Sequence, residues 1–421
     1  MGVYNVVGSI VGLFSVFSNG LTTTIQRFIT FEIGKSKGQQ VNAVFCTSLN
    51  IIFATSIFII ILLETLGLWF LYTQANIPAT SINAAFWVFQ LSVLTCIIEL
   101  ISIPYNSLII AHEKMNAFAT ISILQVLFNW GSAFVLIYSI QSNRLVLYAL
   151  LIASANIIIR IIYQAYCRYE FKESKYHFEI RKDLIKEIGK FTGITSSSSI
   201  LQTITSQGII IIFNMAFGVG INAVYQIAMQ IKNTILSFSL NISRAITPQI
   251  TKTYANGEME THKKLVYGGS KIELFMILFI IMPFIFRADY IMHLWLGNVP
   301  PYATSFTICM LLLSLTYAGF EPIRSSVMAT NKIFRFMIYP EVFYLIATLI
   351  GACLVIIIYK NPNAMIATFV GLEIMTCFIR TLIARKETFI SLTELLQKVV
   401  VPSGIIMCIS TIICYILTLV T

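Results

Sequence analysis

Charged residues are scarce in this sequence. They make up 11% of its 421 residues, whereas hydrophobic residues make up 57%, and the mean hydropathy is +0.84. A single water-soluble core cannot bury this much apolar surface, so lipid must solvate part of it. The composition therefore predicts an integral membrane protein that crosses the bilayer many times.

The short motifs that mark common catalytic and metal sites are also missing. The eight cysteines form no CxxC pair and lie in or beside apolar runs, so we interpret them as reduced packing residues. The four histidines form no HExxH motif and have no metal-ligand spacing on one helix face. The sequence has no glycine-rich nucleotide loop, nucleophile elbow or carboxylate pair. We therefore expect no metal, no catalytic residue and no bound cofactor.

Long apolar runs, separated by short polar gaps, dominate the chain. Their length and their content of Ile, Leu, Val and Phe favour transmembrane helices over the alternating pattern of a membrane barrel. The predicted spans are 3–31, 41–71, 82–110, 115–140, 145–167, 191–217, 221–251, 265–286, 303–328, 336–359, 364–384 and 400–419. The sequence thus predicts an all-α membrane protein with about twelve transmembrane helices.

An internal repeat organises these spans. Residues 2–37 return in degraded form as 223–258, with identities that include Tyr4/Tyr225. A second anchor, 104–118, returns as 322–336 at nearly the same offset. Such self-similarity indicates an ancient duplication. We expect an N-terminal lobe of five helices over 1–180, a C-terminal lobe of six helices over 181–398, and one additional helix over 399–421.

The basic residues indicate an orientation. Lys and Arg concentrate in one set of alternate loops, most densely in 168–190, and are sparse in the other set. The positive-inside rule places loop 168–190 in the cytoplasm and Met1 outside. The same bias accounts for the net charge of +10 without a nucleic-acid partner. The second repeat copy has a helix before it and the first has none, so we expect one helix to be missing before Met1.

Polar residues form stripes within the apolar spans. At about 100° per residue, steps of three and four confine each stripe to one helix face. The stripe of the second copy consists of Gln226, Gln230, Asn233, Ser237, Asn241 and Arg244. The thinner stripe of the first copy consists of Asn5, Ser9, Gly12, Val16, Gly20 and Thr23, with Arg27 one turn further on. A third polar face, on 191–217, consists of Thr192, Thr195, Ser199, Gln202 and Ser206.

Two explanations for the stripes remain open. Small polar residues hold membrane helices together, and packing accounts for Ser, Thr and Gly as well as a cavity does. Gln, Asn and Arg are costly in hydrocarbon unless they meet a partner or water. Their presence on one face favours a water-filled cavity.

Other ionisable residues lie within the spans. Glu99 and Glu373 are lone acids and therefore candidates for proton or sodium coupling. Glu321 is a third candidate, although its spacing from Arg324 also fits a local ion pair on one helix face. Lys232 lies near mid-membrane but off the polar stripe, so it requires another protein contact or a second polar face.

Two further arginines lie closer to the membrane surface. Arg160 and Arg380 fall within two turns of the expected cytoplasmic helix ends. Their long side chains can reach the interface from there, so snorkelling accounts for both.

Three segments carry a family resemblance that extends over essentially the whole chain. Segments 2–35, 103–125 and 191–254 resemble the bacterial polysaccharide flippases, also called O-antigen or capsule repeat-unit translocases. These belong to the multidrug/oligosaccharidyl-lipid/polysaccharide (MOP) exporter superfamily. The resemblance implies two six-helix, pseudo-symmetric lobes around a central cavity, followed by two further helices. This sequence has twelve predicted spans, so we expect the counterparts of the first and last helices to be missing.

The resemblance also implies a function. Such a protein is a non-enzymatic flippase that moves an undecaprenyl-diphosphate-linked oligosaccharide across the bacterial cytoplasmic (inner) membrane, from the inner to the outer leaflet, for lipopolysaccharide or capsule biosynthesis. Its partners would be membrane lipid, a polysaccharide polymerase and a chain-length protein. Polar stripes suit the sugar, and arginine suits the diphosphate. The expected substrate-binding residues are Arg27, Arg244, Asn5, Ser9, Gln226, Gln230, Asn233, Asn241, Gln202 and Lys232.

Two other functions remain open. A drug or metabolite antiporter of the same superfamily would use a membrane-buried acid as its cation-coupling group. A membrane glycan polymerase has similar hydropathy but carries a large outer loop for its chemistry. The longest outer loop predicted here, 287–301, is short.

Overall fold

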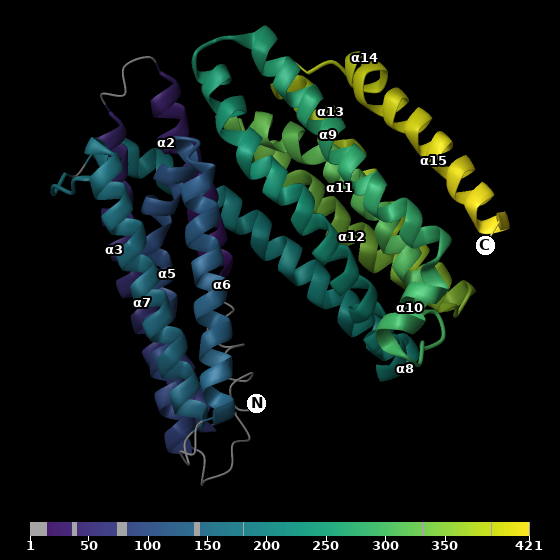
Figure 1. Ribbon diagram of the computed structural model, residues 1–421, viewed down its shortest axis with the longest axis horizontal. Coiled ribbons are helices and arrows are strands. Elements are labelled where there is room, and N and C mark those ends of the chain that lie inside the picture. Colours follow the sequence, from purple (N-terminus) through teal and green to yellow (C-terminus); the bar gives the residue numbers. More distant parts are fainter. Residues whose placement is uncertain are drawn as a thin grey trace. The chain divides into compact units, whose positions relative to one another are not determined.

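The computed structural model describes residues 15–35, 40–73, 82–138, 144–179, 181–330, 332–388 and 390–420. Within these ranges all regular structure is helical and no strand occurs, which confirms the predicted all-α class (Figure 1). Ten of the described helices are long and apolar enough to cross a membrane. The protein is therefore a multi-pass membrane protein.

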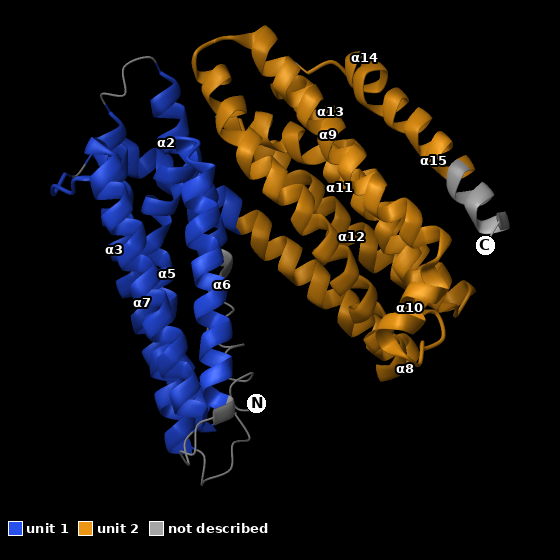
Figure 2. Ribbon diagram, viewed as in Figure 1, with its two compact units in different colours: residues 1–196 blue, residues 197–421 orange. Residues whose placement is uncertain are grey.

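The chain divides into two compact units, 1–196 and 197–421 (Figure 2). In the first unit α5 packs against α2, α3 and α7, and α6 packs against α7. The elements before α8 are α2 (Ser15–Gly34), α3 (Val41–Leu62), the π-helical turn η1 (Leu63–Gly67), α4 (Leu68–Thr73), α5 (Ile82–Ala111), α6 (Met115–Tyr138), α7 (Arg144–Glu170) and η3 (Lys172–Ser174). The turn η1 joins α3 and α4 into one span, 41–73.

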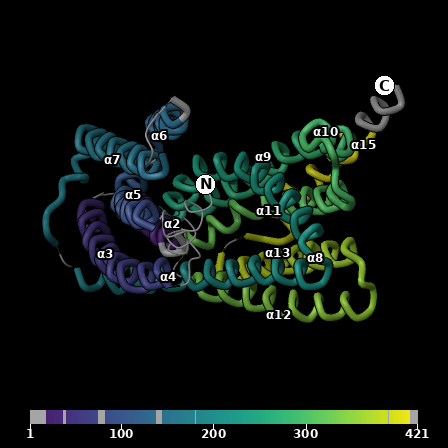
Figure 3. The backbone as a smooth tube through the Cα atoms, turned by 90° about the horizontal axis from the view of Figure 1, so that it is seen from below, coloured from purple at the N-terminus to yellow at the C-terminus, as the bar shows by residue number. Residues whose placement is uncertain are grey.

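In the second unit α11 packs against both α9 and α13, and α12 lies beside α13 (Figure 3). The C-terminal helix α15 contacts α9. The elements are α8 (Lys182–Ala255, which begins in the first unit), α9 (Met259–Phe286), α10 (Ala288–Leu296), α11 (Ala303–Ala329), α12 (Phe334–Ile358), α13 (Pro362–Glu387), α14 (Leu392–Leu395), η4 (Leu396–Val400) and α15 (Val401–Val420).

Helix α8 contains two of the predicted spans. Its 74 residues are interrupted at Gly218, where φ is 82° and ψ is 177°. Only glycine adopts this backbone conformation readily, because a Cβ atom clashes there. The stretches on either side, 182–217 and 219–255, are each long enough to cross a bilayer. With α8 divided here and the partly described span 3–31 included, the helices correspond to the twelve predicted spans.

An aromatic cluster stabilises the core of the second unit. Phe213 of α8 stacks on Tyr225 with 4.8 Å between ring centroids, and it contacts Phe306 of α11 and Phe369 of α13 at 5.6 Å each. These rings come from both stretches of α8 and from two further helices. Burying them ties α8 to α11 and α13, because aromatic pairs add about 0.5–1.5 kcal/mol each beyond their apolar area.

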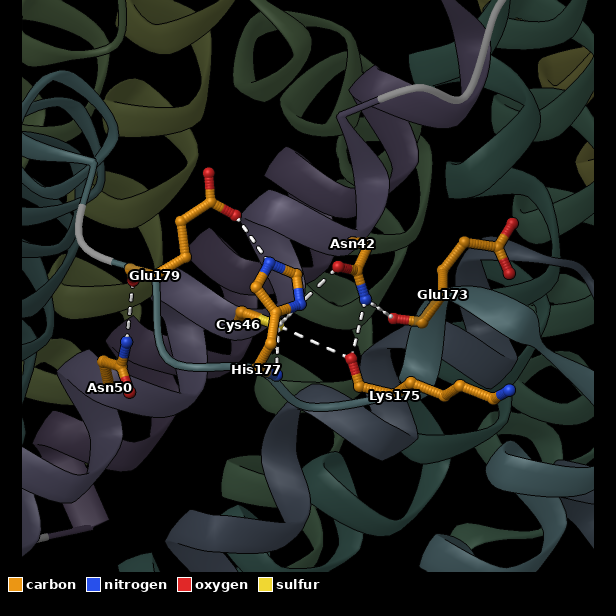
Figure 4. Close-up of polar contacts among 7 residues, drawn as sticks. All are labelled: Asn42, Cys46, Asn50, Glu173, Lys175, His177 and Glu179. Atoms are coloured by element: carbon orange, nitrogen blue, oxygen red, sulfur yellow. Dashed lines mark hydrogen bonds and ion pairs between the residues drawn. The ribbon is translucent and has the colours of Figure 1, made fainter.

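The segment 171–179, which follows α7, is held against α3 by polar contacts (Figure 4). Asn42 Nδ2 donates to the carbonyl oxygens of Glu173, at 2.6 Å, and Lys175, at 2.8 Å. Asn50 Nδ2 donates to the Glu179 carbonyl oxygen at 2.8 Å. Side-chain amides on α3 thereby satisfy backbone carbonyl groups of this segment.

Candidate functional site

A cavity of about 400 Å³ lies inside the second unit, between α8, α11, α12 and α13. Its walls combine apolar side chains with an unusual number of polar and charged groups for a membrane span. The polar lining residues are Gln202, Thr203, Thr205, Ser206, Tyr225, Lys232, Tyr317, Glu341, Tyr344 and Glu373. This mixture is typical of a ligand site rather than of helix packing alone.

A buried arginine connects two of the cavity carboxylates. The Arg380 guanidinium, on α13, pairs with Glu341 on α12, and its Nη1 lies 3.8 Å from Glu373 Oε1. Gln202 Nε2 donates to Glu341 Oε1 at 2.9 Å, and the Tyr317 hydroxyl donates to Glu373. Buried charges persist only when they are paired and hydrogen-bonded, and each of these groups meets that condition.

Lys232 brings a second cation into the same cavity. Its side chain is buried on α8, with Nζ 5.5 Å from the centre of the Tyr317 ring. Among the described residues no carboxylate forms an ion pair with it. Three charged side chains line the cavity, Lys232, Glu341 and Glu373, and Arg380 pairs with the two carboxylates. Arg380, Glu341 and Glu373 form one network, and Lys232 lies over the ring of Tyr317, whose hydroxyl donates to Glu373.

The predicted coupling and cavity residues fall in different places. Gln202, Lys232 and Glu373 all line the cavity. Glu321 and Arg324 form an ion pair on α11, with Arg324 Nη2 2.5 Å from Glu321 Oε1. Glu99 is exposed on α5 of the first unit. The structure therefore brings together one of the three candidate acids with two of the candidate substrate-binding residues.

The polar stripe of α8 faces away from this cavity. Its members Gln226, Gln230, Asn233, Ser237, Asn241 and Arg244 are all exposed. Each cavity residue of the same stretch lies one position before a stripe residue. These cavity residues are Tyr225, Met229, Lys232 and Leu236. One position is about 100° around the helix, so the stretch presents two separate polar faces. One faces into the second unit and the other lies on its surface.

The predicted residues of the first unit are only partly described. Asn5 and Ser9 lie outside the described residues. Arg27 is buried on α2, with its guanidinium carbon 4.6 Å from the ring centres of Phe28 and Phe31 and 5.3 Å from that of Phe191. This aromatic setting places a planar cation against ring faces, where electrostatic attraction stabilises it.

Sequence reasoning missed three residues of the site. Glu341 is an acid within an apolar run, as Glu373 is, so the same reasoning could have made it a candidate. The sequence does not show that it pairs with Arg380. Arg380 was assigned to snorkelling, whereas its side chain is 8% exposed and paired. Tyr317 resembles any aromatic residue of a transmembrane helix. The network becomes visible only when α11, α12 and α13 are packed together.

No protein-family model matches the chain, and no curated protein sequence matches it. Solved structures do match over nearly the whole length. A crystal structure of MATE in complex with MaD3S is 15% identical, covers 91% of each chain and has a TM-score of 0.79. A MOP superfamily transporter from Pyrococcus furiosus is 14% identical, covers 91% of this chain and 86% of its own, and has a TM-score of 0.77.

A third structure shows the outward-facing conformation of a multidrug resistance MATE family transporter of the MOP superfamily. It is 15% identical over 90% of this chain and 87% of its own, with a TM-score of 0.77. The chain has the MATE transporter fold. At this level of identity the similarity to MATE structures establishes the architecture of two helical lobes. The function has to be argued from the site.

Proposed function

We propose that the chain is an alternating-access transporter that flips an undecaprenyl-diphosphate-linked oligosaccharide from the inner to the outer leaflet of a bacterial inner membrane. The buried charged cavity of the second unit carries this proposal. A cavity lined by Lys232, Glu341 and Glu373 within a membrane span is costly to maintain and is typical of transport sites.

The chemistry of the cavity suits an amphiphilic, anionic cargo. Gln202, Thr203 and Ser206 offer amide and hydroxyl groups for sugar hydroxyls, while Tyr225 and Tyr344 offer ring faces for the apolar side of a sugar. Lys232 supplies a cation that no described carboxylate neutralises by direct contact. An ammonium in this position forms charge-assisted hydrogen bonds with a phosphate oxygen.

The exposed stripe of α8 supports the same cargo class. Gln226, Gln230, Asn233 and Asn241 are unfavourable against lipid, so the face that carries them must meet water, protein or cargo. A polar surface along one helix gives a hydrophilic head group a path, while a lipid tail stays in the bilayer. The transported units would then supply a polysaccharide polymerase and its chain-length partner on the outer side.

A second candidate is a cation-coupled drug or metabolite antiporter. Glu341 and Glu373 favour it, because buried carboxylates can exchange a cation or proton as the cavity opens to either side. The fold also occurs in a multidrug resistance MATE family transporter. The two candidates differ in cargo and share alternating access.

Reconstitution of the full chain in proteoliposomes separates the two candidates. One arm follows the appearance of an undecaprenyl-diphosphate-linked oligosaccharide in the opposite leaflet with a membrane-impermeant lectin. The other arm follows ethidium movement driven by a proton or sodium gradient. The proposal expects flipping in the first arm and only background movement in the second. Ethidium transport without flipping would replace the flippase by the antiporter.

A further inference from the structure

A second buried carboxylate of the second unit lies outside the cavity. The Glu273 side chain, on α9, is 0% exposed. Its Oε2 accepts a hydrogen bond from Ser239 Oγ at 2.5 Å, and its Oε1 accepts one from Ser243 Oγ. Both serines lie one turn apart on α8. One turn earlier on α9, the buried Ser270 hydroxyl has no hydrogen-bond partner among the described residues.

Glu273 has no counter-ion among the residues that the structure describes. The nearest charged groups on α11, Glu321 and Arg324, form a fork with each other, with Arg324 Nε 2.9 Å from Glu321 Oε2. On η4 and α14, which lie beside α9, Lys398 pairs with Glu394 at 3.2 Å. No described cation forms an ion pair with Glu273.

The remaining charged groups of the neighbouring helices are also directed elsewhere. On α8, Lys232 lies in the cavity and Arg244 is exposed. On α9 itself, Lys271 lies over the Phe275 ring at 5.4 Å. The described part of α15 contributes no charged side chain. Among the described residues, the Ser239 and Ser243 hydroxyls are therefore the direct polar partners of the Glu273 carboxyl group.

An unpaired carboxylate is too costly at this depth, whereas a neutral carboxylic acid with hydroxyl partners is not. The serine hydroxyls hydrogen-bond to both carboxyl oxygens, so the direct partners of the group are uncharged. We propose that Glu273 is a proton-binding site of the second unit. It is protonated when the unit is in the conformation described here, and it releases the proton when the packing of α8 against α9 changes.

The proton balance is simple. In the acid form the Glu273 O–H donates to one serine oxygen while the other serine donates to the second carboxyl oxygen. When the proton leaves, both Ser239 and Ser243 donate to the carboxylate, so the same two side chains stabilise either state. A hydroxyl donor pair of this kind supports reversible release without a second charged residue.

Further hydrogen-bonded polar groups lie between α8, α9 and α11. Beyond Ser243, Thr247 Oγ1 lies 2.9 Å from Ser325 Oγ of α11. Further on, the buried His262 bridges Ser326 Oγ, 2.7 Å from its Nε2, and the Ile250 carbonyl oxygen, 2.9 Å from its Nδ1. These groups continue along α8, α9 and α11 toward the turn between α8 and α9.

Infrared spectroscopy of the purified full chain tests the proton directly. A protonated carboxyl group has a carbonyl-stretch band separate from the amide bands, and the band shifts in heavy water. We expect Glu273→Gln to remove part of this band at neutral pH, and Ser239→Ala to shift that part to higher wavenumber because a hydrogen bond is lost. The matched control, Glu260→Gln at an exposed position of the same helix, leaves the band unchanged. A wild-type band that Glu273→Gln leaves intact overturns the proposal.

A transport arm links the site to the cycle, and this step rests on the proposed function. Glu273→Gln mimics the protonated form, so its transport should lose the response to an imposed pH gradient while it continues down a cargo gradient. A variant that responds to the pH gradient like the wild type would overturn the coupling role of Glu273. The infrared result needs no cargo, so it stands or fails independently of whether the protein flips a lipid-linked oligosaccharide.

Discussion

Arg380 on α13 forms an ion pair with Glu341 on α12, and the two side chains are only 8% and 4% exposed. The pair joins two helices of the cavity wall and holds the guanidinium within reach of Glu373. Removal of one partner from a buried pair leaves an uncompensated charge, which is more damaging than removal of both.

Arg380→Gln should therefore lower the free energy of unfolding by about 3–5 kcal/mol. The double variant Arg380→Gln/Glu341→Gln should be more stable than Arg380→Gln alone. Thermal unfolding in detergent measures both effects. The control is Lys332→Gln, which breaks a surface pair with Glu387 and should cost at most about 1 kcal/mol. An Arg380→Gln variant as stable as Lys332→Gln would contradict a structural role for the network.

A side chain at Gly218 should lower the stability of the protein, although there is space for one. No atom lies within 4 Å of a Cβ atom added at Gly218, so the cost of Gly218→Ala comes from the backbone alone and amounts to about 1–3 kcal/mol. Gly220→Ala, also in open space but without a positive φ, should be neutral or slightly stabilising. Melting temperatures of the two variants provide the comparison, and equal values would mean that α8 is not interrupted at Gly218.

The two predicted cargo arginines should behave differently. Arg27 is buried against three aromatic rings, so Arg27→Gln should lower the yield of folded protein, with a loss of about 2 kcal/mol from the cation–π contacts. Arg244 is exposed, so Arg244→Gln should leave the amount of folded protein unchanged and reduce transport. Size-exclusion profiles and flipping rates measured on the same preparations would separate the two roles. If Arg27→Gln instead kept its yield of folded protein and lost transport, Arg27 would be a cargo-binding residue.

The segment 171–179 should loosen when its anchor on α3 is removed. Asn42→Ala eliminates two hydrogen bonds to backbone carbonyl groups, so trypsin should cut faster after Lys172 and Lys175. Asn256→Ala, at the turn between α8 and α9, serves as the control and should leave the rate unchanged. Equal cleavage rates in the wild type and Asn42→Ala would show that the contacts of Asn42 do not hold the segment.

The fold could be predicted from the sequence to a large extent, because hydropathy alone determines which stretches must be helical in lipid. The division of α8 at Gly218 also follows from sequence, since the predicted apolar spans 191–217 and 221–251 lie on either side of it. The helical period placed Gln226, Gln230 and Arg244 on one face, and they share one exposed face in the structure.

The site could be predicted only in part, because periodicity orders residues around one helix and does not pair helices. Lys232 was correctly placed off the stripe, but the cavity that it lines is formed with α11, α12 and α13. Glu341 and Arg380 come from different helices, and so do Glu273 and its serines. Arg27 was expected to line a water-filled cavity because it continues the polar stripe of its helix. Its contact with Phe191 could not be foreseen, because the two residues are distant in sequence.

The flipping rate of Lys232→Gln tests the central claim most directly, because Lys232 is the cavity cation without an ion-pair partner among the described residues. The assay uses proteoliposomes with an undecaprenyl-diphosphate-linked oligosaccharide, and Lys271→Gln, which removes a lysine outside the cavity, is the control. The account predicts that Lys232→Gln folds normally but loses most of the flipping activity, whereas Lys271→Gln retains it. Equal flipping by both variants would contradict cargo recognition in this cavity.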